Sequence, residues 1–93
     1  MGIKLMIEGL PLLFSNQQLN DLFAPFGTVL SARVITDHPG KSLRIGEVEM
    51  STAQEAERAM QTLNQSYLQG ELLVVFKRVP KGGSTGQEKK GTP

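Results

Sequence analysis

The stretch RIGEVEM, residues 44–50, has the alternating pattern of a β-strand, in which successive side chains point to opposite faces of a sheet. One face carries small and apolar residues that suit a protein core, namely Gly46, Val48 and Met50. The other face carries an isoleucine and two acids, namely Ile45, Glu47 and Glu49. Because a pair of acids does not suit a core, this strand is expected to have one buried and one exposed face.

Outward from this strand, a unit of strand, helix and strand occurs twice. The first unit comprises a strand at 4–10 (KLMIEGL), a helix that begins after Ser15 and a strand at 29–36 (VLSARVIT). The second comprises the opening strand, a helix capped by Ser51 or Thr52 with Gln54 or Glu55 completing a capping box, and a strand at 71–78 (ELLVVFKR). The loop DHPGKS, residues 37–42, joins the two units.

Each predicted helix has a single apolar stripe at the spacing i, i+3, i+4, i+7. The stripes consist of Leu19, Leu22, Phe23 and Phe26, and of Ala56, Ala59, Met60 and Leu63. With one stripe each, both helices can cover the same face of one sheet. We therefore expect an α+β fold, a ferredoxin-like βαββαβ sandwich with a four-stranded antiparallel sheet and two helices on one face. Right-handed crossovers would place its first and third strands in the centre.

The composition narrows the classes of function. The 93 residues contain no cysteine, and the only histidine, His38, follows Asp37 in a turn. Glu8 and Glu47 are expected to lie close together on neighbouring strands, but the sequence offers no nucleophile, metal-ligand set or phosphate-binding glycine loop to work with them. We expect no enzyme, no cofactor and no metal site. No apolar run has the length of a membrane span, so the chain is expected to be intracellular, cytoplasmic or nuclear, without membrane contact.

The charge is divided unevenly along the chain. The net charge is +1, and the segment PKGGSTGQEKKGTP, residues 80–93, contributes three of the ten basic residues, Lys81, Lys89 and Lys90. That segment has no apolar periodicity and is rich in glycine, so we expect residues 1–79 to fold as one domain and 80–93 to be a disordered tail. Its lysines are expected to reach phosphates without a fixed geometry.

Residues 3–79 resemble the RNA recognition motif family. The resemblance is carried by order and spacing in five segments: LMIEGLP (5–11), LNDLFAPFGTVLSARVITD (19–37), GKSLRIGEVEM (40–50), AERAMQTLN (56–64) and GELLVVFKR (70–78). It implies that the sheet face without helices is a platform for single-stranded RNA, on which aromatic side chains of two signature segments stack on bases.

The signature segments depart from the family at the stacking positions. On the third-strand pattern K/R-G-F/Y-G/A-F-V-x-F/Y, Leu43 stands at the position of the basic residue, Arg44 at that of the first glycine, and Ile45 and Glu47 at those of the first and second aromatics. On the first strand, Met6 replaces the aromatic. Ile45 and Met6 can lie against a base more weakly than a ring, and Glu47 is expected to accept a hydrogen bond from an exocyclic amine.

The other strands add to this face. Leu73 and Val75 are expected in the core, which leaves Phe76 as the one aromatic expected on the platform, within an apolar band formed by Met6, Ile35, Ile45, Val74 and Phe76. Basic residues surround the band. The complete set expected to contact RNA is Lys4, Met6, Glu8, Arg33, Ile35, Lys41, Arg44, Ile45, Glu47, Val74, Phe76, Lys77 and Arg78.

Two other interpretations of the exposed face stay open at this point. The apolar band can be the contact with a protein partner or with a second copy of the chain, and the missing aromatics and low net charge favour that use. The band can also be covered by the chain after Val79. Tyr67, just before the last strand, is expected to be structural.

Overall fold

The computed structural model describes residues 2–37 and 40–78. Its elements, in chain order, are β1 (Ile3–Glu8), α1 (Asn16–Phe23), the 3₁₀ helix η1 (Ala24–Phe26), β2 (Val29–Thr36), β3 (Ser42–Met50), α2 (Ala53–Leu63), β4 (Tyr67–Leu68), β5 (Glu71–Leu72) and β6 (Val74–Lys77). The predicted tail at 80–93 and its lysines, together with His38, lie outside the described residues.

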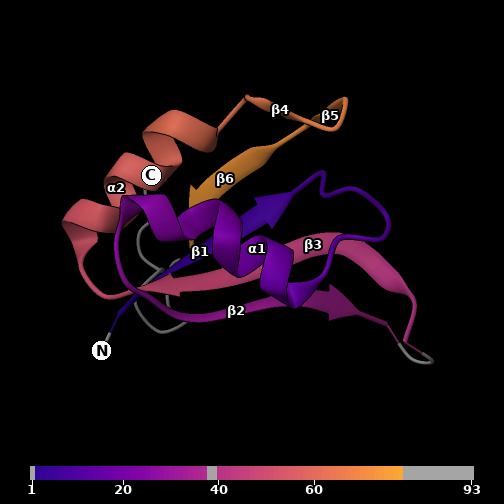
Figure 1. Ribbon diagram of the computed structural model, residues 1–93, viewed down its shortest axis with the longest axis horizontal. Helices are drawn as coiled ribbons and strands as arrows, with labels where there is room; N and C mark the ends of the chain where they lie inside the picture. The colour runs from indigo at the N-terminus through magenta and orange to yellow at the C-terminus, as the bar shows by residue number, and fades with distance from the viewer. Residues whose placement is uncertain (1, 38–39, 79–93) are drawn as a thin grey trace, which may run out of the picture.

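The predicted sheet is confirmed. Four strands pair antiparallel in the order β2-β3-β1-β6, so β1 and β3 are central. Figure 1 shows α1 and α2 together on one side of this sheet. The opposite face of the sheet carries neither helix, which is the ferredoxin-like arrangement that the two apolar stripes predicted.

The core lies between the helices and the sheet. Val48 and Met50 of β3 are fully buried, as the opening strand predicted, and so are Leu19 and Phe23 of α1. Gly46 belongs to the same face, because a Cβ there would lie 2.7 Å from Cδ2 of Leu19. Burial of each large apolar side chain stabilises the fold by about 1.5–3 kcal/mol.

Both helices begin where the sequence predicted. The Ser15 hydroxyl accepts a hydrogen bond from the Gln18 N–H, and the Gln18 side chain accepts one from the Ser15 N–H, which completes a capping box. At α2 the cap is Thr52, which accepts from the Glu55 N–H. The Glu55 carboxylate instead accepts hydrogen bonds from the Ser51 hydroxyl and the Thr28 N–H, and these bonds lower its pKa.

The last predicted strand is wrong in its extent. Residues 71–78 do not form one strand, because Glu71–Leu72 pairs with Tyr67–Leu68 in a separate two-stranded hairpin and only Val74–Lys77 joins the main sheet. Gly70, at φ 83°, forms the turn of that hairpin in the left-handed region that glycine tolerates. Tyr67 is 72% exposed in this hairpin and away from the main sheet.

Candidate functional site

The sheet face opposite the helices is organised into rows by the strand register. Residues directly opposite each other on paired strands point to the same face. One row crosses all four strands as Arg33, Glu47, Met6 and Phe76. The next row is Ile35, Ile45, Glu8 and Val74. The apolar band expected from the sequence therefore lies on one face, in two adjacent rows.

The exposure of the band varies across the sheet. Phe76 and Val74, on the edge strand β6, are 42% and 38% exposed. Met6, Ile35 and Ile45 are half-buried. Among the described residues, Phe76 is the only aromatic side chain in these two rows. Within the band, the edge at β6 therefore offers the most accessible apolar surface.

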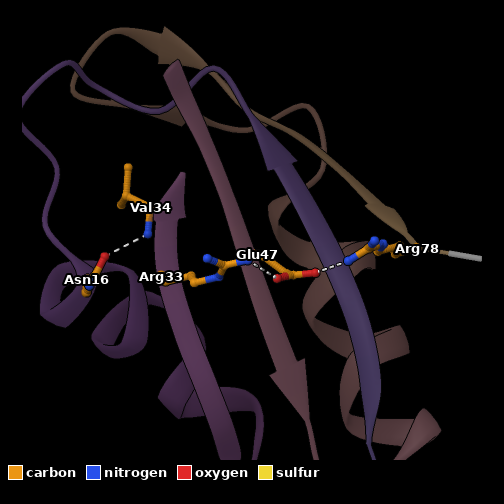
Figure 2. A network of polar contacts seen from close by, with 5 residues as sticks. All are labelled: Asn16, Arg33, Val34, Glu47 and Arg78. Carbon is orange, nitrogen blue, oxygen red and sulfur yellow. Dashed lines mark hydrogen bonds and ion pairs between the residues drawn. The ribbon is translucent and has the colours of Figure 1, made fainter. Parts of the chain in front are cut away.

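Glu47 lies in the middle of the face and is bound from two sides. Its Oε1 accepts a hydrogen bond from Nη2 of Arg33 at 3.3 Å, and its Oε2 accepts one from Nη1 of Arg78. Figure 2 shows the carboxylate between the two guanidinium groups, which approach from opposite directions. We call these three residues, Arg33, Glu47 and Arg78, the carboxylate clamp.

Arg78 reaches the clamp from beyond the end of β6. Its N–H donates to the carbonyl of Lys4 at 2.8 Å, which continues the pairing with β1 by one residue. Its side chain then crosses β1 to Glu47 on β3 (Figure 2). The clamp therefore joins β2, β3 and the end of β6, and it passes over β1, which lies between β3 and β6.

The environment of Glu47 keeps it ionised. Burial alone would raise its pKa, because a charged carboxylate loses hydration. Hydrogen bonds from Arg78 and Arg33, together with the nearby positive charge of Lys4, outweigh this effect and lower the pKa of Glu47. The clamp therefore contains two guanidinium cations and one carboxylate at neutral pH.

The surroundings of Glu47 differ from those expected in two respects. We expected it to be open to the exocyclic amine of a base, but its residue exposure is 7% and both oxygens accept from arginine. It also does not face a second acid directly, because the register places Met6 opposite Glu47 and Ile45 opposite Glu8. Alternation of side chains along β2 puts Arg33 on this face, and that signal was available from the sequence.

The basic residues expected around the band lie in different places. Lys4 is exposed on the face, opposite Glu49. Lys41 is exposed at the loop before β3, where its N–H donates to Oδ1 of Asp37. Lys77 is opposite Leu5, a core residue, so it belongs to the helical side of the sheet.

Arg44 has a structural environment. It lies at an irregularity of the β2–β3 pairing and has a φ of 61°, in the left-handed region. Its Nε donates to the carbonyl of Leu10 at 2.9 Å, and its Nη2 lies 3.0 Å from Oε1 of Glu71. The first glycine of the family pattern falls at this position, and the φ value shows why glycine suits it.

Both edge strands are bonded by an asparagine side chain. The Oδ1 of Asn16, at the start of α1, accepts from the Val34 N–H of β2 at 2.7 Å (Figure 2). The Oδ1 of Asn64, at the end of α2, accepts from the Val75 N–H of β6 at 2.9 Å. Since β2 and β6 are the outer strands, each asparagine supplies an acceptor to an amide that points away from the sheet, where no neighbouring strand pairs with it.

Neither a metal-ligand group nor a membrane-spanning helix is found in the described part of the chain. Residues 2–37 and 40–78 contain no group of three or more acidic or histidine side chains that could hold a metal ion. No helix in these ranges is long and apolar enough to cross a membrane.

Comparisons with known proteins found a matching family model and several similar proteins. The model of the RNA recognition motif matches residues 5–74. A polyadenylate-binding protein of Candida glabrata, named as cytoplasmic and nuclear, is 40% identical over 74 residues, which are 80% of this chain and 13% of that protein. Polyadenylate-binding protein 4 of Arabidopsis thaliana is 35% identical over 74 residues, which are 80% of this chain and 11% of that protein. The chain thus spans a small part of these relatives.

One solved structure shares the fold of this chain over nearly the whole length of the solved protein. The crystal structure of the RNA binding protein PG1 superposes with a TM-score of 0.80 and 32% identity, covering 85% of this chain and 96% of that one.

Proposed function

This chain belongs to the RNA recognition motif family, and from that membership we propose that it binds single-stranded RNA across the sheet face opposite the helices. The observation that carries the proposal is the exposed apolar surface of Phe76 and Val74, continued by Met6 across β1. Bases of single-stranded RNA are unpaired and can lie against such a surface. In this proposal the chain binds RNA and catalyses no reaction.

The charges on the face support binding at a moderate strength. Lys4 is exposed beside the band, and the side chains of Arg33 and Arg78 are 65% and 54% exposed although each bonds Glu47. These cations can meet phosphates, which would make the affinity fall as salt rises. With a net charge of +1, the chain has little bulk charge to add to these local contacts.

Adenylate-rich RNA is the first ligand to test. Two relatives, from Candida glabrata and Arabidopsis thaliana, are named for binding polyadenylate. The name of the first also places that protein in the cytoplasm and nucleus, and we propose the same compartments here.

The test is fluorescence anisotropy with labelled twelve-nucleotide oligoadenylate, oligouridylate and mixed-sequence RNA. Replacing Phe76 by Ala should weaken binding by about 1–3 kcal/mol, the usual effect of losing one base–aromatic contact. Tyr67→Ala is the matched control, because Tyr67 is also an exposed aromatic but lies on the separate hairpin. Equal losses in the two variants would contradict the placement on the sheet face.

The alternative use of the face, a protein contact or self-association, gives a different result in the same samples. If wild-type chain binds none of the RNAs but forms dimers that Phe76→Ala dissociates, the apolar band serves association. Sedimentation velocity at increasing protein concentration measures this directly.

A further inference from the structure

The position where the family pattern places a stacking ring is occupied by the carboxylate clamp. Glu47 stands at the second aromatic position of the third-strand signature, yet its side chain is only 9% exposed. The groups that reach solvent around it are the guanidiniums of Arg33 and Arg78, with side chains 65% and 54% exposed. A ligand approaching the centre of the face therefore meets arginine rather than glutamate.

Hydrogen bonding to Glu47 leaves the flat surfaces of the arginines available. A guanidinium is planar, and its N–H groups point outward within that plane. Each arginine uses one terminal nitrogen for Glu47, Nη2 in Arg33 and Nη1 in Arg78. These bonds therefore occupy an edge of each group and do not cover the planar faces, on which bases of RNA can stack.

The clamp also reduces the cost of using an arginine as a platform. A free arginine loses much rotamer freedom when it is fixed against a ligand. Here Glu47 holds both arginines before any ligand arrives, and a buried, ionised carboxylate is a strong acceptor for them. The single carboxylate partly neutralises two cations, which weakens their pull on phosphate without changing their shape.

We propose that Arg33 and Arg78, held in place by Glu47, supply the stacking surface that rings provide elsewhere in the family, and that an unpaired RNA base lies on a guanidinium plane at the clamp. This inference rests on the proposed RNA binding. Phe76 lies in the same row as Arg33 and Glu47, so a second base has a surface next to the first. Glu47 is a positioning residue in this arrangement, because it acts through the arginines.

Arginine-to-lysine substitutions separate stacking from charge. Arg33→Lys and Arg78→Lys keep the positive charge but remove the planar group. Each should weaken binding of labelled oligoadenylate by about fivefold or more, while the slope of log affinity against log salt stays unchanged. Arg58→Lys is the matched control, because Arg58 is exposed on α2, among the helices. Unchanged affinity in both clamp variants would overturn the proposal.

The sign of the effect at Glu47 is a second test. Removing an acid from an RNA-binding face should tighten binding if only charge matters. Under the clamp proposal, Glu47→Gln weakens binding of oligoadenylate by several fold, because the carboxylate that fixes the two arginine side chains is lost. The loss should be much smaller when Arg78 is already lysine, since the two changes disturb one unit. Equal or tighter binding by a folded Glu47→Gln variant would overturn the proposal.

A base-free polyanion distinguishes this inference from the proposed function as a whole. Polyphosphate competes for cations but offers nothing to stack. The lysine variants should bind polyphosphate as tightly as the wild type does, while they lose affinity for oligoadenylate. If they lose both equally, the arginines are phosphate contacts and the stacking proposal fails, although RNA binding by the face stands. If wild-type chain binds no RNA, the proposed function fails first.

Discussion

Arg44 and Leu10 bond each other in both directions. The Leu10 N–H donates to the Arg44 carbonyl at 3.0 Å, and the Arg44 Nε donates to the Leu10 carbonyl at 2.9 Å. This pair fastens the segment after β1 to the start of β3, and the contact of Arg44 with Glu71 adds the β4–β5 hairpin. One side chain thus ties three segments together at one end of the sheet.

Substitutions at Arg44 should separate this tie from the backbone strain. Arg44→Ala loses the side-chain contacts and keeps a Cβ at φ 61°, whereas Arg44→Gly loses the same contacts and relieves the left-handed backbone. We expect the Gly variant to be more stable than the Ala variant by about 1 kcal/mol, measured by urea denaturation. An Ala variant as stable as the Gly variant would show that the φ value carries no cost.

Gly9 and Gly70 form a matched pair for a test of close packing. Their φ values are similar, 89° and 83°, so alanine meets the same backbone strain at both. A Cβ at Gly9 would lie 2.1 Å from the Leu72 carbonyl oxygen, while a Cβ at Gly70 meets nothing within 4 Å. Gly70→Ala should cost about 1–2 kcal/mol, and Gly9→Ala should cost about 1–3 kcal/mol more. Thermal unfolding of both variants gives the comparison, which fails if the two midpoints coincide.

Stability should depend on pH through Glu47. Because its folded pKa is lowered, ionised Glu47 stabilises the fold above its ordinary pKa of 4.5, and this contribution is lost as pH falls through the lowered pKa. Glu47→Gln cannot ionise and should be less stable by about 1–3 kcal/mol at neutral pH. The deficit should shrink on acidification below about pH 4.5.

Urea midpoints of wild type and Glu47→Gln across this pH range provide the measurement. Glu55 also has a lowered pKa, but it is the same in both proteins and cancels in the difference. A deficit that stays constant down to about pH 3 would mean that the carboxylate charge adds nothing to the fold.

The two edge asparagines should differ in their contribution to stability. The bond from Val75 to Asn64 is partly buried, whereas the bond from Val34 to Asn16 is exposed. Water can replace an exposed acceptor but reaches a buried amide poorly. Asn64→Ala should therefore cost about 1–2 kcal/mol and Asn16→Ala about 0.5 kcal/mol or less. Hydrogen exchange should also quicken at the Val75 amide in the first variant; equal costs would contradict the difference in burial.

Much of the fold follows from local patterns that the sequence displays directly. The alternation in residues 44–50 identified the core face of β3, because burial on one side requires a period of two. The stripes of α1 and α2 placed both helices on one side, since each had a single face to bury. The short β4–β5 hairpin escaped prediction because strands of two residues are too short to show a period.

The site was predictable in its position and less so in its chemistry. The residues of the face followed from strand alternation, but the state of Glu47 depends on two arginines that are 14 and 31 residues away in sequence. One of them, Arg78, acts from beyond the end of its strand. Strand alternation shows which face a side chain lies on, but it does not show which distant side chains on that face reach one another.

The position of Arg78 also bears on where this module ends. The family match stops at residue 74, the first residue of β6, yet the clamp is completed four residues later. A chimera joined at residue 74 would carry both helices and three strands of the sheet. It would lack Arg78, one of the two arginines of the carboxylate clamp. A segment transferred into another protein therefore has to extend through Arg78 if it is to keep the carboxylate clamp.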